Sequence, residues 1–532
     1  MAEEVELKLA LAPGHQSRFL RHPLLQQAVE RHVETLDNIY YDTTELSLRR
    51  RGIALRLRRK GRDWLQTVKL AGSSAAGLSS RPEWEMPYHG HFDFSPIDQP
   101  AVREWLQRPR LLARIVPICE TRFRRVTWTF PAAPGAILLT LDRGWIVANG
   151  RREAISELEL ELAGAPVQAI FDLALQLARR VALTPSTLSK AERGYRLYSG
   201  TLPAPVKAEP VLLSATLPPF EAFRRVALAC LEHLQQNHHG ALGSDDPEYI
   251  RQMRLATRRL RAALRLFAPI LPEYLADSLR EPLAALMQQL DRARDLDVLL
   301  GEIVDPVLRS LPDEPRLPAL AGDITNRRYA ARAQAIALLA TPDHGRALLT
   351  ALQVLQQAPP ADPEMLALHG FATERLKRLG RELKRISAAD SEDPASLHAL
   401  GIAVKRLHRA LELFSSLAPQ RPLRRAVKQL AAIRQTLSRL DELASAGAML
   451  MECAGDDPRL REAVTLIGGW HGPRYARLRA RLARQRARLT RLRLPRLGCA
   501  PGSAGITQAP GVGPDQQRRQ FNGPDTLASR RS

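Results

Sequence analysis

The chain has 532 residues, 45% of them hydrophobic, and a formal net charge of +22. Two or more domains fit into this length, and the charge indicates a polyanionic partner: nucleic acid, inorganic polyphosphate, a phosphorylated metabolite or an anionic membrane surface. The aromatic fraction of 5% argues against a stacking platform for single-stranded nucleic acid.

Four widely spaced cysteines form no CxxC pair, which favours unpaired thiols in a reducing cytosol over a disulfide framework or a zinc site. The N-terminus opens into an acidic strand rather than a signal peptide, and no apolar run approaches membrane-spanning length. We therefore expect a cytoplasmic protein without a membrane partner.

The first strand is expected at residues 4–8, and it is unusual. Side chains alternate faces along a strand, so Glu4, Glu6 and Lys8 share one face while apolar side chains fill the other. Similar strands recur up to about residue 200, at 53–59, 65–70, 81–86, 122–124, 137–141 and 155–162. The strand at 137–141 is expected to end before a turn at 143–144, and helices are expected at 13–31 and 171–181.

The charged faces of these strands allow two structures. If they point outward, the sheet is an ordinary solvated one; if they point inward, the sheet closes into a tunnel lined by acids and bases. Alternation fixes faces and not directions, but the chemistry favours the tunnel. Four of its carboxylates are hard ligands suited to Mg²⁺ or Mn²⁺, namely Glu4, Glu6, Glu159 and Glu161. Basic side chains would clamp several phosphates, namely Lys8, Arg56, Arg58, Lys69, Arg122 and Arg124.

An ordered set of motifs over about 200 residues carries a family resemblance. Glu4-x-Glu6-x-Lys8 resembles the ExExK signature of the CYTH domain, the fold of the triphosphate tunnel metalloenzymes. Further blocks match in order at 40–43, 55–58, 67–69, 81–85, 122–124, 141–142, 156–162 and 189–195.

The resemblance implies an eight-stranded antiparallel tunnel that hydrolyses a triphosphate with a divalent metal. The four carboxylates named above would hold the metal, and the basic residues together with Lys190 would bind phosphates. Glu85, Asp142 and Glu157 are further tunnel acids that we assign to catalysis, in which a water attacks the terminal phosphorus in line. No P-loop is present to suggest a different nucleotide-binding fold.

A proline-rich connector at 201–219 separates this first domain, residues 1–200, from a helical part at 220–494. An apolar stripe and a basic ridge run along a helix at 247–272, and both recur at 394–419, an offset of 147 residues. The offset extends into the following helix. We therefore expect a pseudo-symmetric, internally duplicated helical bundle, so the overall fold class is α+β with two domains.

The helical part resembles the CHAD domain, which implies binding of inorganic polyphosphate. The residues expected to bind it are Arg251, Arg254, Arg258, Arg261, His398 and Lys405. The histidine usual in the first repeat is Arg251 here, which keeps an anion-binding charge. Gly401 and His408 replace arginines usual in the second repeat and weaken its ridge.

The end of the chain is basic and then low in complexity. A last helix is expected at 474–493, with arginines along one side that could widen the anion surface or bind nucleic acid non-specifically. Residues 495–532 are rich in Gly, Pro, Ser and Gln, and we expect them to be disordered.

Together, these features predict a cytoplasmic inorganic triphosphatase, with polyphosphate granules as one location in the cell. The alternatives are a non-catalytic polyphosphate scaffold, a thiamine triphosphatase and an adenylyl cyclase of the same tunnel fold. Nucleic-acid binding is a weaker option for the whole protein.

Overall fold

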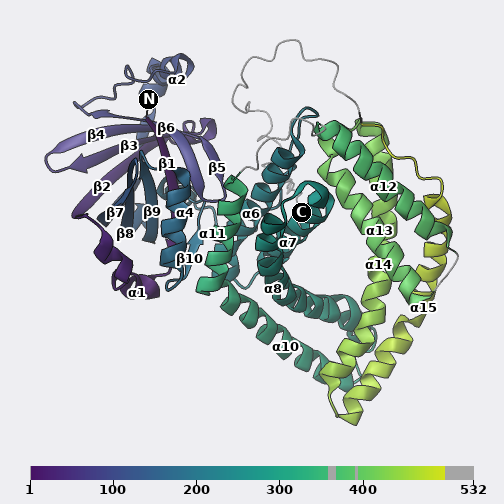
Figure 1. The fold of residues 1–532 in the computed structure, drawn as a ribbon. Helices are drawn as coiled ribbons and strands as arrows, with labels where there is room; N and C mark the ends of the chain where they lie inside the picture. The colour runs from purple at the N-terminus through teal and green to yellow at the C-terminus, as the bar shows by residue number, and fades with distance from the viewer. Residues whose placement is uncertain (1, 358–366, 390–392, 498–532) are drawn as a thin grey trace, which may run out of the picture.

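The computed structural model describes residues 2–357, 367–389 and 393–497. A strand-rich half comes first and an all-helical half follows, so the predicted fold class is confirmed (Figure 1). The predicted disordered tail lies almost entirely outside the described residues.

Within the described residues, eight strands of the first half close into a barrel-shaped sheet. All neighbouring strands are antiparallel, and β1 pairs with β9 on one side and with β6 on the other, which closes the sheet. The strands follow the order β1 (Ala2–Leu11), β9 (Arg151–Ala163), β8 (Gly135–Ala148), β7 (Ile115–Ala132), β2 (Glu30–Thr43), β3 (Ile53–Lys60), β4 (Asp63–Leu70) and β6 (Leu78–Pro87). Short strands β5 (Ser73–Ala75) and β10 (Leu183–Pro185) pair with β6 and β1.

The alternating pattern of each strand decides which side chains face the tunnel. The apolar faces point outward and are covered by helices: Leu7, Leu9 and Leu158 share one buried cluster with α1 (Gln16–Leu20) and α4 (Val167–Ala178). On the far side of the sheet, Leu55 and Trp84 pack against α2 (Pro100–Leu106). The charged faces therefore point inward, and the expectation of a tunnel rather than a solvated sheet is confirmed.

Two local expectations are wrong. The helix expected at 13–31 is reduced to α1 between two 3₁₀ turns, and β2 begins at Glu30, because Pro23 interrupts the helical backbone. The turn expected at 143–144 is absent from the described chain, since β8 continues to Ala148. The turn lies instead at Asn149-Gly150, where both residues have the positive φ of a tight hairpin.

The helical half is built on the predicted duplication. Helices α7 (Pro247–Phe267) and α13 (Pro394–Leu413) begin 147 residues apart, as do α8 (Glu273–Val298) and α14 (Gln420–Ala454). The aspartates directly before α7 and α13 cap both helices in the same way. The remaining helices are α6 (Pro219–Gly243), α9 (Asp305–Ser310), α10 (Arg316–Leu339), α11 (Pro342–Gln356), α12 (Leu368–Ala388) and α15 (Pro458–Leu489).

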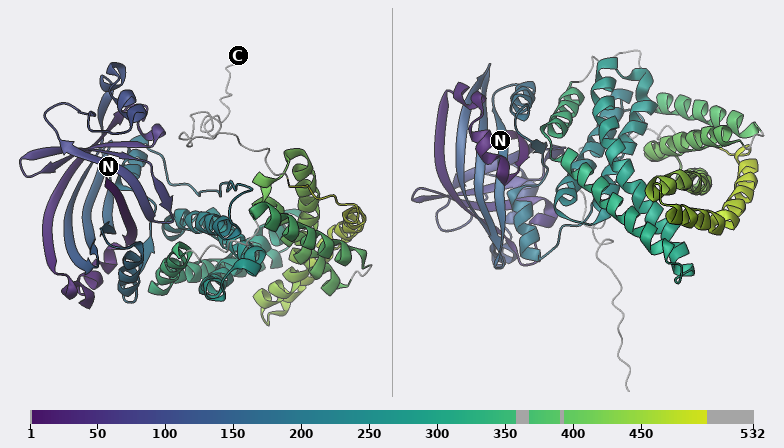
Figure 2. Two further views of the ribbon diagram at one scale, coloured as in Figure 1. Left: turned by 45° about the horizontal axis from the view of Figure 1, so that its top comes forward. Right: turned by 90° about the horizontal axis from the view of Figure 1, so that it is seen from below.

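The two halves share a packed interface, which Figure 2 shows from two sides. Helix α11 of the helical half lies against α4 and β10 of the first half. The contact is close: a Cβ atom on Gly345 would lie 1.9 Å from the backbone oxygen of Leu183. At the rim, the Gln353 side chain donates a hydrogen bond to Asp172 at 2.7 Å. One apolar cluster therefore runs from the sheet into the helices.

Cys119, Cys230 and Cys453 are buried free thiols, whereas Cys499 lies outside the described residues. Among the described residues, we find no helix with the length and apolar character needed to cross a membrane.

Candidate functional site

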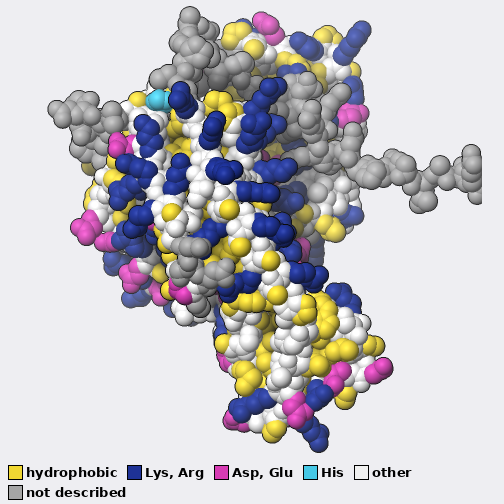
Figure 3. All heavy atoms as spheres, turned by 90° about the vertical axis from the view of Figure 1, so that its right-hand side faces the viewer, with side chains coloured by type: hydrophobic (Ala, Val, Ile, Leu, Met, Phe, Trp, Pro, Cys, Tyr) yellow, Lys and Arg dark blue, Asp and Glu magenta, His cyan; other side chains and the backbone are white. Residues whose placement is uncertain are grey.

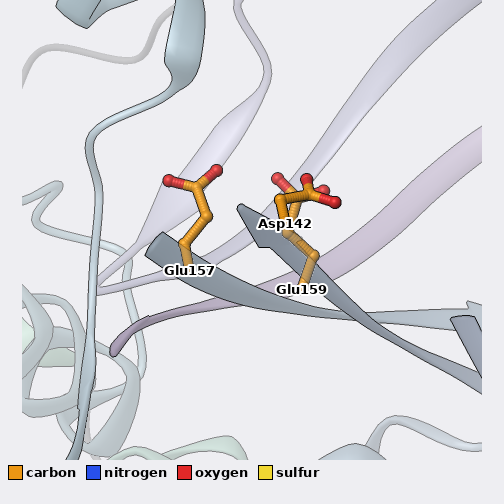
Figure 4. Close-up of side chains that lie close together, drawn as sticks. All are labelled: Asp142, Glu157 and Glu159. Atoms are coloured by element: carbon orange, nitrogen blue, oxygen red, sulfur yellow. The ribbon is translucent and has the colours of Figure 1, made fainter. Parts of the chain in front are cut away.

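The tunnel holds a compact group of three acids around a lysine. Asp142 on β8 and Glu157 and Glu159 on β9 bring carboxylate oxygens within 4.8 Å of one another (Figure 4). The ammonium of Lys190, the first residue of α5 (Lys190–Ser199), lies 2.6 Å from Asp142, 2.5 Å from Glu157 and 3.1 Å from Glu159. This acidic cluster therefore already contains a cation from the chain itself.

Arginine and lysine side chains complete the charge balance around Glu159. Arg125 on β7 binds Asp142 through two nitrogens and also donates to Glu159 at 2.6 Å, while Lys8 lies 3.0 Å from Glu159. Burial alone would raise the pKa of Glu159, but Lys190, Lys8 and Arg125 hold it well below its ordinary value. Glu159 is thus ionised and held by three cations.

Beside the first strand, in contrast to Glu159, one carboxylate lies without a basic partner. Glu4 accepts from Lys69 at 2.8 Å, and Glu6 accepts from Arg81 at 2.5 Å. Glu161 lies opposite Glu6 on β9, and among the described residues no ion pair joins it to a base. Burial, together with the nearby charges of Glu4 and Glu6, raises the pKa of Glu161 to about 7. Within the described residues, Glu161 is therefore the carboxylate of this group that has no basic partner, while Glu4 and Glu6 are paired with Lys69, Arg81 and Lys8.

An excess of positive charge lies on β3. The side chain of Arg56 is 3.7 Å from Glu83 and 3.9 Å from Glu85. Arg58 donates to the amide oxygen of Asn38 at 3.0 Å, and within the described residues it has no carboxylate partner. Burial and the charges of Arg56 and Arg125 lower the pKa of Arg58 to about 10. An anion bound here would relieve this repulsion.

The tunnel contains two groups of carboxylates, the ligand type that suits a hard divalent cation, and in one of them, Asp142, Glu157 and Glu159, the oxygens lie within 4.8 Å of one another. At the group around Lys190, an ammonium already neutralises the carboxylates. Glu4, Glu6 and Glu161 form the other group, and the charges of Glu4 and Glu6 contribute to the raised pKa of Glu161.

The structure does not bring every predicted phosphate-binding residue into the tunnel. Arg122 and Arg124 lie on the outer face of β7, where the side chain of Arg122 is 80% exposed and 3.4 Å from Asp37. Arg125 occupies the inward position instead, beside Phe123. The other predicted tunnel residues all face inward: Glu4, Glu6, Lys8, Arg56, Arg58, Lys69, Glu85, Asp142, Glu157, Glu159, Glu161 and Lys190.

Sequence reasoning therefore missed Arg125, and a signal for it exists. Val126, Trp128 and Phe130 form an apolar alternation on the outer face of β7. Extending this alternation backwards places Arg122 and Arg124 on the same outer face and turns Arg125 inward. Arg81 and Glu83 on β6 are likewise tunnel residues, since they pair with Glu6 and Lys69.

Helix α5 packs against β7, β8 and β9 next to Lys190. Ala191 and Tyr195 are buried against Tyr40 and Cys119 of the sheet. Gly194 is required at this contact, because a Cβ atom there would lie 2.2 Å from the sulfur of Cys119. Lys190 is held in place by this packing.

The helical half contains a second charged site, a cavity of about 1100 Å³ between α7, α8, α12, α13 and α14. Eleven of its lining residues are Arg or Lys and three are Glu. Of the six predicted polyphosphate-binding residues, Arg258, Arg261 and Lys405 line this cavity.

The other three predicted residues lie outside it. Arg251 pairs with Glu248 of its own helix, Arg254 is bound to Asp291, and His398 is exposed. The cavity instead gains basic residues that the sequence reasoning did not select, namely Arg265, Arg294, Arg375, Arg378, Arg406, Arg409, Arg434 and Arg439.

A closed antiparallel sheet lined by acids and bases, followed by a duplicated helical bundle around a basic cavity, defines a two-domain tunnel protein. Residues 2–195 match the CYTH domain and residues 225–451 match the CHAD domain. The chain therefore contains a CYTH domain in its first half and a CHAD domain in its second half.

Individual relatives match parts of the chain. An inorganic triphosphatase of Haemophilus influenzae is 31% identical over 199 residues, which is 37% of this chain and 56% of that protein, so the match spans little more than half of the relative. The CHAD domain from the plant Ricinus communis is 34% identical, with 56% of this chain and 99% of that one covered and a TM-score of 0.49. HpAC1 from Hippeastrum, described as having a dominant triphosphatase activity, is 19% identical over 37% of this chain and 97% of that one, with a TM-score of 0.27.

Proposed function

We propose that the tunnel hydrolyses inorganic triphosphate to diphosphate and phosphate with Mg²⁺ or Mn²⁺. The observation that carries this proposal is a pair of uncompensated charges inside one tunnel. Arg58, beside Arg56, lacks a carboxylate partner among the described residues, and Glu161, beside Glu4 and Glu6, lacks a basic one. A metal–triphosphate complex supplies both missing charges.

The tunnel residues would have different roles, phosphate binding or metal binding, according to their positions. Arg56, Arg58, Lys69, Lys8 and Arg125 would orient the phosphate chain and stabilise charge that builds up on its oxygens in the transition state. A metal held by Glu4, Glu6 and Glu161, with Glu159 beside it, would neutralise phosphate charge. Glu159 itself is the weaker ligand, because three cations already hold it.

The three acids assigned to catalysis differ in whether their carboxylates are free to contact a water molecule. Asp142 and Glu157 are buried and bound to Lys190, so they would hold that lysine toward the substrate. Glu85 has a side chain that is 41% exposed, with Thr67 donating to it at 3.3 Å. Of the three, Glu85 is the carboxylate best placed to position the attacking water.

The test is phosphate release from inorganic triphosphate by the full chain and by E4Q/E6Q, each with and without Mg²⁺ or Mn²⁺. ATP and thiamine triphosphate run alongside. Metal-dependent release that the double variant loses supports the proposal. Release from ATP as a cyclic product, or a preference for thiamine triphosphate, would favour one of the two enzymatic alternatives. Tight polyphosphate binding without release from any substrate would make the protein a scaffold.

We further propose that the helical cavity binds inorganic polyphosphate, because its eleven basic residues greatly outnumber its three acids. A linear chain of phosphates matches a cavity of this composition, with arginines that can bind oxygens in pairs. Polyphosphate binding by the full chain and by R258Q/R261Q/K405Q checks this proposal. Unchanged affinity in the triple variant would contradict it.

A further inference from the structure

The last long helix, α15, carries a second basic surface that lies apart from the helical cavity. Between residues 474 and 493 the sequence has nine arginines and no acidic residue. None of the residues that line the cavity comes from α15. Its basic side chains therefore serve neither the tunnel nor the cavity.

Five of these arginines form a straight row, which we call the α15 stripe: Arg477, Arg481, Arg484, Arg488 and Arg491. The first four follow one another at steps of four and three residues, so they lie on one face of the helix over about 16 Å, and Arg491 follows directly after the end of the helix. All five are exposed, and among the described residues no ion pair joins them to a carboxylate.

Neighbouring helices widen this surface. Arg486 donates to the backbone oxygen of Ser387 at the end of α12, and Gln429 near the start of α14 donates to the backbone oxygen of Arg488. The adjoining turns of both helices expose more basic side chains, namely Arg381, Lys384, Arg385, Arg421, Arg424, Arg425 and Lys428. Figure 3 shows the resulting gathering of Lys and Arg on the α12 and α15 side of the molecule.

We infer that this face, with the α15 stripe at its centre, binds the phosphate backbone of double-stranded nucleic acid without reading its sequence. Arginine rather than lysine dominates, and its planar guanidinium binds phosphate oxygens in pairs. The apolar side of α15 (Leu478, Leu482 and Leu489) is buried in the bundle, so it cannot insert into a lipid surface.

The shape of the face separates a duplex from a single phosphate chain. Helices pack about 8–10 Å apart, and both α12 and α14 contact α15, so the basic side chains are spread over the width of three helices. A duplex spreads its phosphates along both edges of a groove about 12 Å wide, whereas an inorganic chain is narrow and is better enclosed by the helical cavity.

The experiment measures binding of fluorescent DNA and RNA duplexes of about 20 base pairs to the full chain, as a function of salt concentration. The stripe variant is R481Q/R484Q/R488Q, and the matched control is the cavity variant R258Q/R261Q/K405Q. Removing three phosphate contacts is expected to make the slope of log affinity against log salt shallower by about 2.7 in the stripe variant. The cavity variant is expected to keep the slope of the wild type.

Several outcomes would overturn the inference. These are no duplex binding by the wild type at low salt, a duplex affinity that falls in the cavity variant and not in the stripe variant, or equal slopes in all three proteins. Vesicles containing phosphatidylserine and long-chain polyphosphate serve as competing probes. If the stripe variant no longer binds the vesicles or the polyphosphate while its duplex binding is unchanged, the surface binds a membrane or polyphosphate instead. Circular dichroism shows that each variant remains folded.

Discussion

At the scale of single residues, Glu161 is a partly buried carboxylate of the tunnel that has no basic partner among the described residues. Its pKa of about 7 means that the folded chain binds a proton between about pH 4.5 and 7 where the unfolded chain does not. The free energy of unfolding must therefore fall as pH rises through this window, and it stays low above it.

We expect E161Q to be more stable than the wild type at pH 8 without metal, by about 1–2 kcal/mol after allowance for solvent screening. Below about pH 4.5 the difference should vanish, since both side chains are then neutral. Denaturant unfolding at several pH values measures this. Mg²⁺ or Mn²⁺ should stabilise the wild type at pH 8 and leave E161Q almost unchanged. Equal metal-induced stabilisation of both proteins would remove Glu161 from the metal site.

Arg122 and Arg125 offer a matched pair on one strand, the first outside the tunnel and the second inside. We expect R125K to lower kcat/KM for triphosphate by on the order of 100-fold, because lysine keeps the charge and loses the paired hydrogen bonds. R122K should behave as the wild type. Steady-state kinetics of both variants decides this, and a larger loss in R122K would mean that the outer face takes part.

At the scale of elements, the sequence predicts the faces of strands better than their directions or ends. Alternation at Glu4, Glu6 and Lys8 marks one charged face, but closure of the sheet depends on β1 pairing with β6, a contact between segments about 75 residues apart that no local pattern encodes. At β7 the arginines lie on both faces, so two neighbouring charges alone select the wrong side. The cavity residues of α12 were missed for a similar reason, since this helix lies outside the repeat.

Helix α11 can pack closely against β10 because its residue 345 is a glycine. G345A should lower the free energy of unfolding by about 1–3 kcal/mol, because its Cβ would meet the backbone oxygen of Leu183 at 1.9 Å. The control is G401A in α13, where a Cβ would meet nothing within 4 Å and should stabilise the helix by about 0.5–1 kcal/mol. Thermal unfolding of both variants tests this contact, and a stabilising G345A would contradict it.

At the scale of the whole molecule, the helical half is part of the support of the tunnel. Helix α11 covers α4 and β10, and β10 pairs with β1, the strand that carries Glu4, Glu6 and Lys8. Because the apolar cluster runs through this interface, helix α11 of the helical half covers apolar side chains of the strand-rich half and keeps them from water. The two halves are therefore coupled through packing, independently of any ligand that they share.

This coupling predicts the behaviour of a chain truncated after Pro210. Loss of about 2 kcal/mol of packing would lower the Tm of the strand-rich half by about 4–8 °C, given the size of that half. Triphosphate hydrolysis well below this Tm should persist, since every inward-facing tunnel residue precedes the cut. Thermal unfolding and phosphate release, measured on the same preparations, separate these two effects. If the truncated chain unfolds at the temperature of the full one, α11 does not stabilise the tunnel. If it is stable but inactive, the helical half contributes to the reaction itself.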